Sequence, residues 1–281
     1  MKKGLIVIAL LVLVIVGGIV FYLFDRQERA EAPPVVALPV EPGPAQPAIE
    51  LPVPEPPPFT VDEKRVPVDT RLDELPLPPL NESDGYVQEN VAAVVGEAAA
   101  MQYFAADGLA SRAVATVDAL GSRQVPGNIQ AVAGPETDYM AYPDPDPPAE
   151  ILDEQGDLVQ QYLSDPGNSS RYNTYVEMIE AVDAEQFAAL YHRNSPLFQQ
   201  AWRELGYTDV AFDDRLAEVI DELLATPEVE EPYRLVKPEA VYLFADEELE
   251  ALSAGQKIML RMGSENRARV KSKLSEFRKA L

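Results

Sequence analysis

Histidine and cysteine, two residue types that often carry acid–base or nucleophilic chemistry, are almost absent from this chain. Its 281 residues include a single histidine, His192, and no cysteine. Thiolate metal sites, cysteine nucleophiles, disulfides and multi-histidine metal sites are therefore excluded. His192 could act as a general base, but no serine or aspartate accompanies it in a recognised nucleophile arrangement, and Ser195 suits a helix cap better. This histidine alone predicts no catalytic site.

Other motifs that approach a catalytic or ligand-binding pattern fail on spacing. Ser253 and Lys257 are four residues apart, whereas the Ser-x-x-Lys pattern needs three. The run Asp144-Pro-Asp146 lacks the glycine and the terminal glutamate of a calcium loop. No Gly-rich phosphate loop occurs. We therefore expect no metal and no cofactor, and the sequence favours a protein that is not an enzyme.

Five polar or amphipathic residues interrupt otherwise apolar helical segments. They are Arg171, Tyr172, Tyr191, Arg261 and Asn266. In one interpretation they make structural hydrogen bonds inside a helical bundle. In the other they line a candidate binding groove for a ligand. The two interpretations differ in whether these side chains converge in space.

The C-terminal segment, residues 257–281, is basic. It has eight bases and two acids, a net charge of +6, against −30 for the rest of the chain. In the favoured interpretation its apolar stripe docks into the domain and its bases meet acidic neighbours. A second interpretation is a recognition surface for an acidic partner protein or envelope polymer, and a third is binding to a membrane surface. The candidate recognition residues are Arg267, Lys271 and Arg278.

The acidic remainder of the chain bears on its partners. A surface with a large negative charge repels nucleic acid and anionic lipid at long range. We therefore expect no nucleic-acid partner.

The segment Gly4–Phe24 is predicted to be a transmembrane helix. Its 21 residues carry no charge, and a helix of that length spans about 32 Å, close to the hydrocarbon thickness of a bilayer. Residues 1–3 form a short tail with two lysines. The positive-inside rule places this tail in the cytoplasm.

A cleaved signal peptide is the competing interpretation of this segment. The run Ala30-Glu31-Ala32 has the small-x-small form of a cleavage site. However, the apolar run is longer than the roughly 7–15 residues of a signal-peptide core, and charges separate it from that site. A membrane anchor is therefore favoured. Both interpretations place the rest of the chain outside the cytoplasm.

Residues 25–80 are predicted to be a proline-rich linker. The stretch from Pro33 to Leu80 holds 15 of the 26 prolines, which disfavours helix and sheet. Such a stretch can be a semi-rigid spacer or a ligand for a proline-binding module. The spacer is favoured, because no basic residue flanks the densest prolines.

Residues 81–281 are predicted to form an α-helical domain. Apolar residues recur at helical spacing, and glycines and prolines separate the segments. The clearest amphipathic pattern runs from Phe212 to Leu224. The expected fold class is mainly α: an irregular multi-helix domain with at most a short β element.

Local signals predict several helix boundaries in this domain. Ser253 with Gln256 forms a capping box. The pair Ser195-Pro196 is a typical helix start, with a capping residue followed by proline at the first helical position. We also expect a helix over residues 150–163.

Several short runs together resemble a known bacterial family. They are Arg171-Tyr172, Leu190-Tyr191, Pro196-Leu197, Glu204 to Tyr207, Leu223 to Pro227, Phe244-Ala245-Asp246, Leu249-Glu250, Leu252 to Lys257, Arg261-Met262-Gly263 and Glu265-Asn266. Over residues 75–281, and in the layout of anchor and prolines, the chain is similar to Gram-negative membrane-anchored proteins catalogued only as a domain of unknown function. The resemblance implies a Gram-negative envelope setting and supplies no activity.

These features together predict a membrane-tethered periplasmic interaction or scaffold module of the bacterial envelope. The chain would be a single-pass inner-membrane protein with a cytoplasmic N-terminus and a periplasmic domain. Its expected partners are the inner membrane, contacted through Gly4–Phe24, and an acidic envelope protein or polymer. The alternative is an unrecognised envelope hydrolase with a site near His192.

Overall fold

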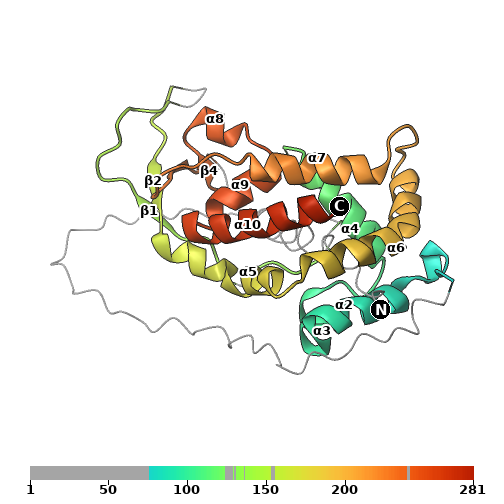
Figure 1. The fold of residues 1–281 in the computed structure, drawn as a ribbon. Coiled ribbons are helices and arrows are strands. Elements are labelled where there is room, and N and C mark those ends of the chain that lie inside the picture. The colour runs from blue at the N-terminus through green and yellow to red at the C-terminus, as the bar shows by residue number, and fades with distance from the viewer. Residues whose placement is uncertain (1–75, 124–128, 130, 136, 153–155, 239–240) are drawn as a thin grey trace, which may run out of the picture.

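The computed structural model describes residues 76–281 except 124–128, 130, 136, 153–155 and 239–240. This part of the chain is mainly helical, with nine α-helices and a small four-stranded sheet (Figure 1). The predicted transmembrane segment Gly4–Phe24 and the linker up to residue 75 lie outside the described residues. None of the helices in the described ranges is long and apolar enough to cross a membrane.

Most of the α-helices begin or end close to the glycines and prolines from which helix boundaries were predicted. They are α2 (Asp84–Val95), α3 (Glu97–Tyr103), α4 (Leu109–Leu120), α5 (Asn173–Glu180), α6 (Ala184–Glu204), α7 (Phe212–Leu224), α8 (Glu247–Glu250), α9 (Ala254–Arg261) and α10 (Ser264–Ala280). Two 3₁₀ helices, η2 (Leu80–Glu82) and η3 (Pro166–Tyr172), precede α2 and α5. Leu80, at the end of the predicted linker, is buried in the helical core.

The C-terminal helix α10 forms the centre of the helical part. Figure 1 shows α7 on one side of it and α5 and α6 on the other, and α10 contacts all three. Its apolar residues Val270, Leu274 and Phe277 are buried. The apolar stripe predicted from the sequence therefore docks into the domain.

Helix α9 packs closely against α4 and α7. Its capping box is formed as predicted, with Ser253 accepting from the backbone N–H of Gln256 and the Gln256 side chain accepting from that of Ser253. A Cβ atom at Gly255 would lie 2.6 Å from a methyl carbon of Leu223 and 3.1 Å from the carbonyl oxygen of Leu120. Glycine thus permits this close approach.

The sheet lies at the end of the helical part where α10 begins (Figure 1). Its strands β1 (Ala141–Pro143), β2 (Gln161–Ser164), β3 (Arg234–Val236) and β4 (Leu243–Phe244) are antiparallel in this order. Four strands exceed the single short β element that we expected. Together with α9 they enclose a second apolar cluster, of Tyr233, Leu235, Phe244 and Leu260.

The helix predicted over residues 150–163 is wrong. Gln161–Ser164 is strand β2, and Leu152 and Leu158 form an isolated antiparallel bridge. Strand β2 pairs on one edge with β1 and on the other with β3. Because both partners are distant in sequence, the local pattern did not reveal them.

The predicted helix start at Ser195-Pro196 is also wrong. Helix α6 continues through Pro196, although proline cannot donate a backbone hydrogen bond. The rings of Tyr191 and Phe198, on either side of the proline, are stacked with centroids 5.8 Å apart, and Phe198 also contacts Phe212 of α7. Packing on both sides of the proline therefore outweighs the local signal.

Candidate functional site

The candidate site lies where the helical part meets the sheet, and three segments build it. The loop before β1 contributes Tyr139, η3 contributes Arg171 and Tyr172, and α9 ends in Arg261. Asn168 of η3 fixes the loop, because its side chain accepts from the backbone N–H of Met140 at 2.8 Å and donates to the Met140 carbonyl at 2.7 Å. These two hydrogen bonds to the Met140 backbone hold the neighbouring Tyr139 beside η3.

Two arginines gather around the ring of Tyr139. The guanidinium carbon of Arg171 lies 5.7 Å from the ring centroid, and that of Arg261 lies 5.6 Å from it. Arg171 also lies 5.6 Å from the ring of Tyr172, and Arg261 lies 5.4 Å from that of Phe244. Contacts of this length are typical of cation–π interactions. Two positive charges thus meet at one aromatic cluster, which we call the arginine–tyrosine cluster (Tyr139, Arg171, Tyr172 and Arg261).

Backbone carbonyls orient both guanidinium groups. Arg171 donates from Nε to the Thr137 carbonyl at 3.0 Å, and a second, short bond from Nη2 reaches the same oxygen. Arg261 donates from Nη2 to the Tyr242 carbonyl at 2.6 Å. Neither arginine forms an ion pair with any carboxylate of the described residues. That is unusual in a chain with a net charge of −24.

Three buried donors of the cluster have no acceptor among the described residues. They are Nη1 of Arg171, Nε of Arg261 and the hydroxyl of Tyr172. A buried donor without an acceptor costs about 1–3 kcal/mol, and more when it is charged. Both arginine side chains are partly exposed, so the cluster is adjacent to solvent. The arrangement can bind an anion through charge-assisted hydrogen bonds.

The tyrosines of the cluster stay protonated at neutral pH. Burial raises the pKa of Tyr139 to about 12, although Arg261 opposes the shift. Burial also raises the pKa of the fully buried Tyr172, against the opposing charges of Arg171 and Arg261. Both hydroxyls therefore keep their protons, and neither is poised as a base.

Further aromatic rings and one lysine border the cluster. The ring of Tyr242 lies 6.2 Å from that of Tyr139 and 5.3 Å from that of Tyr162. The exposed Lys237 has its Nζ atom 5.0 Å from the centroid of Tyr242. The border thus adds aromatic surface and a third positive charge.

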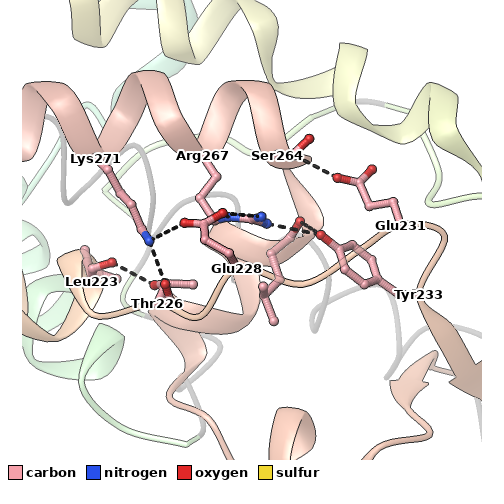
Figure 2. A network of polar contacts seen from close by, with 9 residues as sticks. Leu223, Thr226, Glu228, Glu231, Tyr233, Ser264, Arg267 and Lys271 are labelled. Atoms are coloured by element: carbon pink, nitrogen blue, oxygen red, sulfur yellow. Dashed lines mark hydrogen bonds and ion pairs between the residues drawn. The ribbon is translucent and has the colours of Figure 1, made fainter.

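A polar network on α10 supports the end of α9 that carries Arg261 (Figure 2). The hydroxyl of Tyr233 donates to the Leu260 carbonyl at 3.0 Å and accepts from Nη1 of Arg267 at 3.2 Å. Arg267 is 1% exposed and pairs with Glu228 at 2.8 Å. The network therefore fixes the backbone of the residue that precedes Arg261.

The three residues of the predicted basic recognition surface all pair with acids of the same chain. Arg267 and Lys271 share the carboxylate of Glu228, with Lys271 at 2.6 Å, as Figure 2 shows. Arg278 pairs with Asp221 at 2.9 Å. The Arg267 side chain is buried, so it contributes no exposed charge.

Two of the five candidate groove residues lie outside the arginine–tyrosine cluster and have partners. The hydroxyl of Tyr191 donates a short hydrogen bond to Asp213. Asn266 donates to the Ser169 carbonyl at 3.0 Å and to the side chain of Asn173 at 3.1 Å. The structure thus brings together Arg171, Tyr172 and Arg261.

His192 is exposed on α6, with its ring 5.8 Å from that of Tyr191. Among the described residues, no group of three or more His, Cys, Asp or Glu side chains is placed to hold a metal ion.

The family described as "Protein of unknown function (DUF3014)" matches residues 109–278, more than half of the chain. The chain belongs to the DUF3014 family. The resemblance to a domain of unknown function is thereby confirmed. No match is found among curated proteins or among solved structures.

All four residues of the arginine–tyrosine cluster lie within the DUF3014 match. Arg171, Tyr172 and Arg261 were predicted from the sequence, whereas Tyr139, around which the two arginines gather, was not. The available signal was weak, because Tyr139 lies in a loop rich in glycine and proline. Nothing local marks that loop as part of a site.

Proposed function

We propose that this DUF3014 protein is a membrane-tethered interaction module of the bacterial envelope that binds an anionic group at the arginine–tyrosine cluster. One observation carries the binding part of the proposal: Arg171, Tyr172 and Arg261 present three buried donors that have no acceptor in the described part of the chain. An anion at this position would accept from all three and would offset the adjacent positive charges.

The chemistry of the cluster supports binding more than catalysis. Arginine stays protonated at any physiological pH, and the raised pKa values of Tyr139 and Tyr172 keep their protons in place. A site made of such groups holds and orients an anion. It offers no group ready to accept a proton, as a hydrolase requires.

The tether and the location come from the sequence. Gly4–Phe24 would anchor the chain in the inner membrane, with residues 1–3 in the cytoplasm. Residues 25–80 would act as a spacer and hold the domain in the periplasm. There it would meet the partner, an acidic envelope protein or polymer that presents the anionic group.

Photocrosslinking in living cells tests the proposal. Met140 is 60% exposed and lies next to Tyr139, whereas Met101, on α3, is 80% exposed. We expect Met140→p-benzoylphenylalanine to capture an envelope component, and the Met101 counterpart to fail. The capture should disappear in Arg171→Ala and Arg261→Ala. Capture from position 140 that both arginine variants leave unchanged would refute the binding part.

The topology is tested separately. Protease added to spheroplasts should digest the domain in the wild type. Full protection of the domain would contradict the proposed orientation but would not bear on the proposed binding site.

A further inference from the structure

The number and origin of the free donors indicate the shape of the anion. A carboxylate has two oxygens in one plane and is typically bound by the two parallel donors of one arginine. Here each arginine contributes one buried donor without an acceptor among the described residues, Nη1 of Arg171 and Nε of Arg261, and Tyr172 adds a hydroxyl. Three donors from three side chains suit a group with three free oxygens in a tetrahedral arrangement.

The charge of the site indicates a dianion. Arg171 and Arg261 form no ion pair with a described carboxylate, and two acids on neighbouring segments accept hydrogen bonds from backbone N–H groups. Asp165 accepts from the Gly167 N–H at 2.7 Å, and Glu231 accepts from the Ser264 N–H at 2.7 Å. A monoanion would leave one of the two positive charges unbalanced.

We propose that the arginine–tyrosine cluster binds a phosphate monoester, carried by a solute or a polymer and not by a lipid surface. This inference rests on the proposed function and specifies its ligand. A phosphate monoester has three free oxygens and a second pKa of about 6, so it is a dianion at neutral pH.

The charge distribution favours a single phosphate group over a lipid surface. Membrane surfaces attract proteins that present many free bases together. In this domain the bases Arg267, Lys271 and Arg278 of α10 are paired internally, and the whole chain carries a net charge of −24. Long-range repulsion from anionic lipid therefore opposes docking of the domain on a membrane.

Calorimetric titration of the full chain in mild detergent at pH 8 tests this inference. The probes are methyl phosphate, dimethyl phosphate and acetate. We expect methyl phosphate to bind at least about tenfold more tightly than the other two, because each lacks a charge or an oxygen that the cluster can use. Equal affinity for all three, or a preference for acetate, overturns the phosphate assignment but leaves an anion site. If none of the three probes binds, and vesicles containing phosphatidic acid do not bind either, the proposed binding function is overturned as well.

Variants localise the binding. Arg261→Lys keeps the charge but removes the Nε donor, and Tyr172→Phe removes the hydroxyl; each should weaken methyl phosphate binding roughly ten- to a hundred-fold. Arg203→Lys, at an exposed arginine in the last turn of α6, should leave it unchanged. Equal loss in all three variants would overturn the assignment to this cluster. Vesicles containing phosphatidic acid form the last arm, with phosphatidylcholine vesicles as the control for insertion of the predicted anchor. If the wild type binds phosphatidic acid vesicles more tightly than the control vesicles and Arg261→Lys abolishes that difference, while methyl phosphate does not bind, the claim that the ligand is not a lipid is wrong.

Discussion

Arg171 and Arg261 place their guanidinium carbons 5.7 and 5.6 Å from the centroid of the same ring, that of Tyr139. One arginine comes from a 3₁₀ helix and the other from the end of α9, so only the fold brings them together. No carboxylate of the described ranges pairs with either arginine, and two positive charges held side by side in this way destabilise the folded state. Binding sites commonly carry such a cost, because the ligand supplies the missing partner.

The first prediction concerns the hydroxyl of Tyr172. It is fully buried and has no acceptor among the described residues. We expect Tyr172→Phe to leave the free energy of unfolding unchanged or to raise it by up to about 1 kcal/mol, because an unsatisfied polar group is removed. Urea denaturation in phosphate-free buffer measures this difference.

Tyr175, three residues further along the chain, is the matched control because its hydroxyl has a hydrogen-bond partner. Its buried hydroxyl donates to the Ala133 carbonyl at 3.0 Å. Tyr175→Phe should therefore lower the free energy of unfolding by about 1 kcal/mol. If Tyr172→Phe were as destabilising as Tyr175→Phe, the Tyr172 hydroxyl would have a structural partner and the cluster would lose one of its free donors.

The second prediction concerns Gly255, where α9 closely approaches α4 and α7. A Cβ atom there would overlap Leu223 and the backbone of Leu120, so Gly255→Ala should destabilise the fold by about 1–3 kcal/mol. Gly85, in the first turn of α2, has no atom within 4 Å of an added Cβ. Gly85→Ala should stabilise by about 0.5–1 kcal/mol, because alanine favours helix. Thermal unfolding of both variants tests the prediction. The melting temperature should fall in Gly255→Ala and rise in Gly85→Ala, and a change of the same sign in both variants would contradict it.

The third prediction concerns the ion pair between Arg267 and Glu228: removing the acid should cost more stability than removing the base. Arg267 is 1% exposed and Glu228 is 69% exposed. Glu228→Ala leaves a buried charge without a carboxylate and should cost about 2–3 kcal/mol. Arg267→Met leaves only an exposed acid and keeps the packing, and should cost about 1 kcal/mol. Chemical denaturation that ranks the two variants in the reverse order would contradict this description of the network.

Glu228 also predicts a pH dependence. Hydrogen bonds from Lys271 and Arg267 lower the pKa of Glu228 from its ordinary value of 4.5. A carboxyl with a lowered folded-state pKa stabilises the protein above its unfolded-state pKa, and this contribution is lost as the pH falls through the folded value. The stability difference between the wild type and Glu228→Gln should thus be constant from pH 6 to 8 and shrink below about pH 4.5. A difference that grows in acid would show that the shift has the opposite sign.

Local signals in the sequence predicted much of the helical part. The capping box at Ser253, the amphipathic pattern of α7 and the apolar stripe of α10 each depend on residues within a few turns of one another. The sheet was not predictable in this way. Strand β2 is held by β1 and β3, and its pairing with Val236 depends on a residue far along the chain.

The candidate site shows the same limit. Arg171, Tyr191 and Asn266 have the same local signature, a polar residue in an apolar segment. Tyr191 and Asn266 are satisfied by Asp213 and by the Ser169 carbonyl, whereas Arg171 keeps a free donor. Whether a polar group finds a partner is decided by tertiary contacts, so the sequence could name the residues but could not separate them.

The most direct test of the central claim observes the Nε–H group of Arg261 itself. In an NMR spectrum of the full chain labelled with ¹⁵N-arginine, the Nε signal of Arg261 is assigned by its disappearance in Arg261→Lys. We predict that added methyl phosphate shifts this signal in a saturable manner and leaves that of the exposed Arg203 in place. An Arg261 signal that does not move at saturating methyl phosphate, or that moves only in step with Arg203, would contradict the claim that the cluster binds an anion.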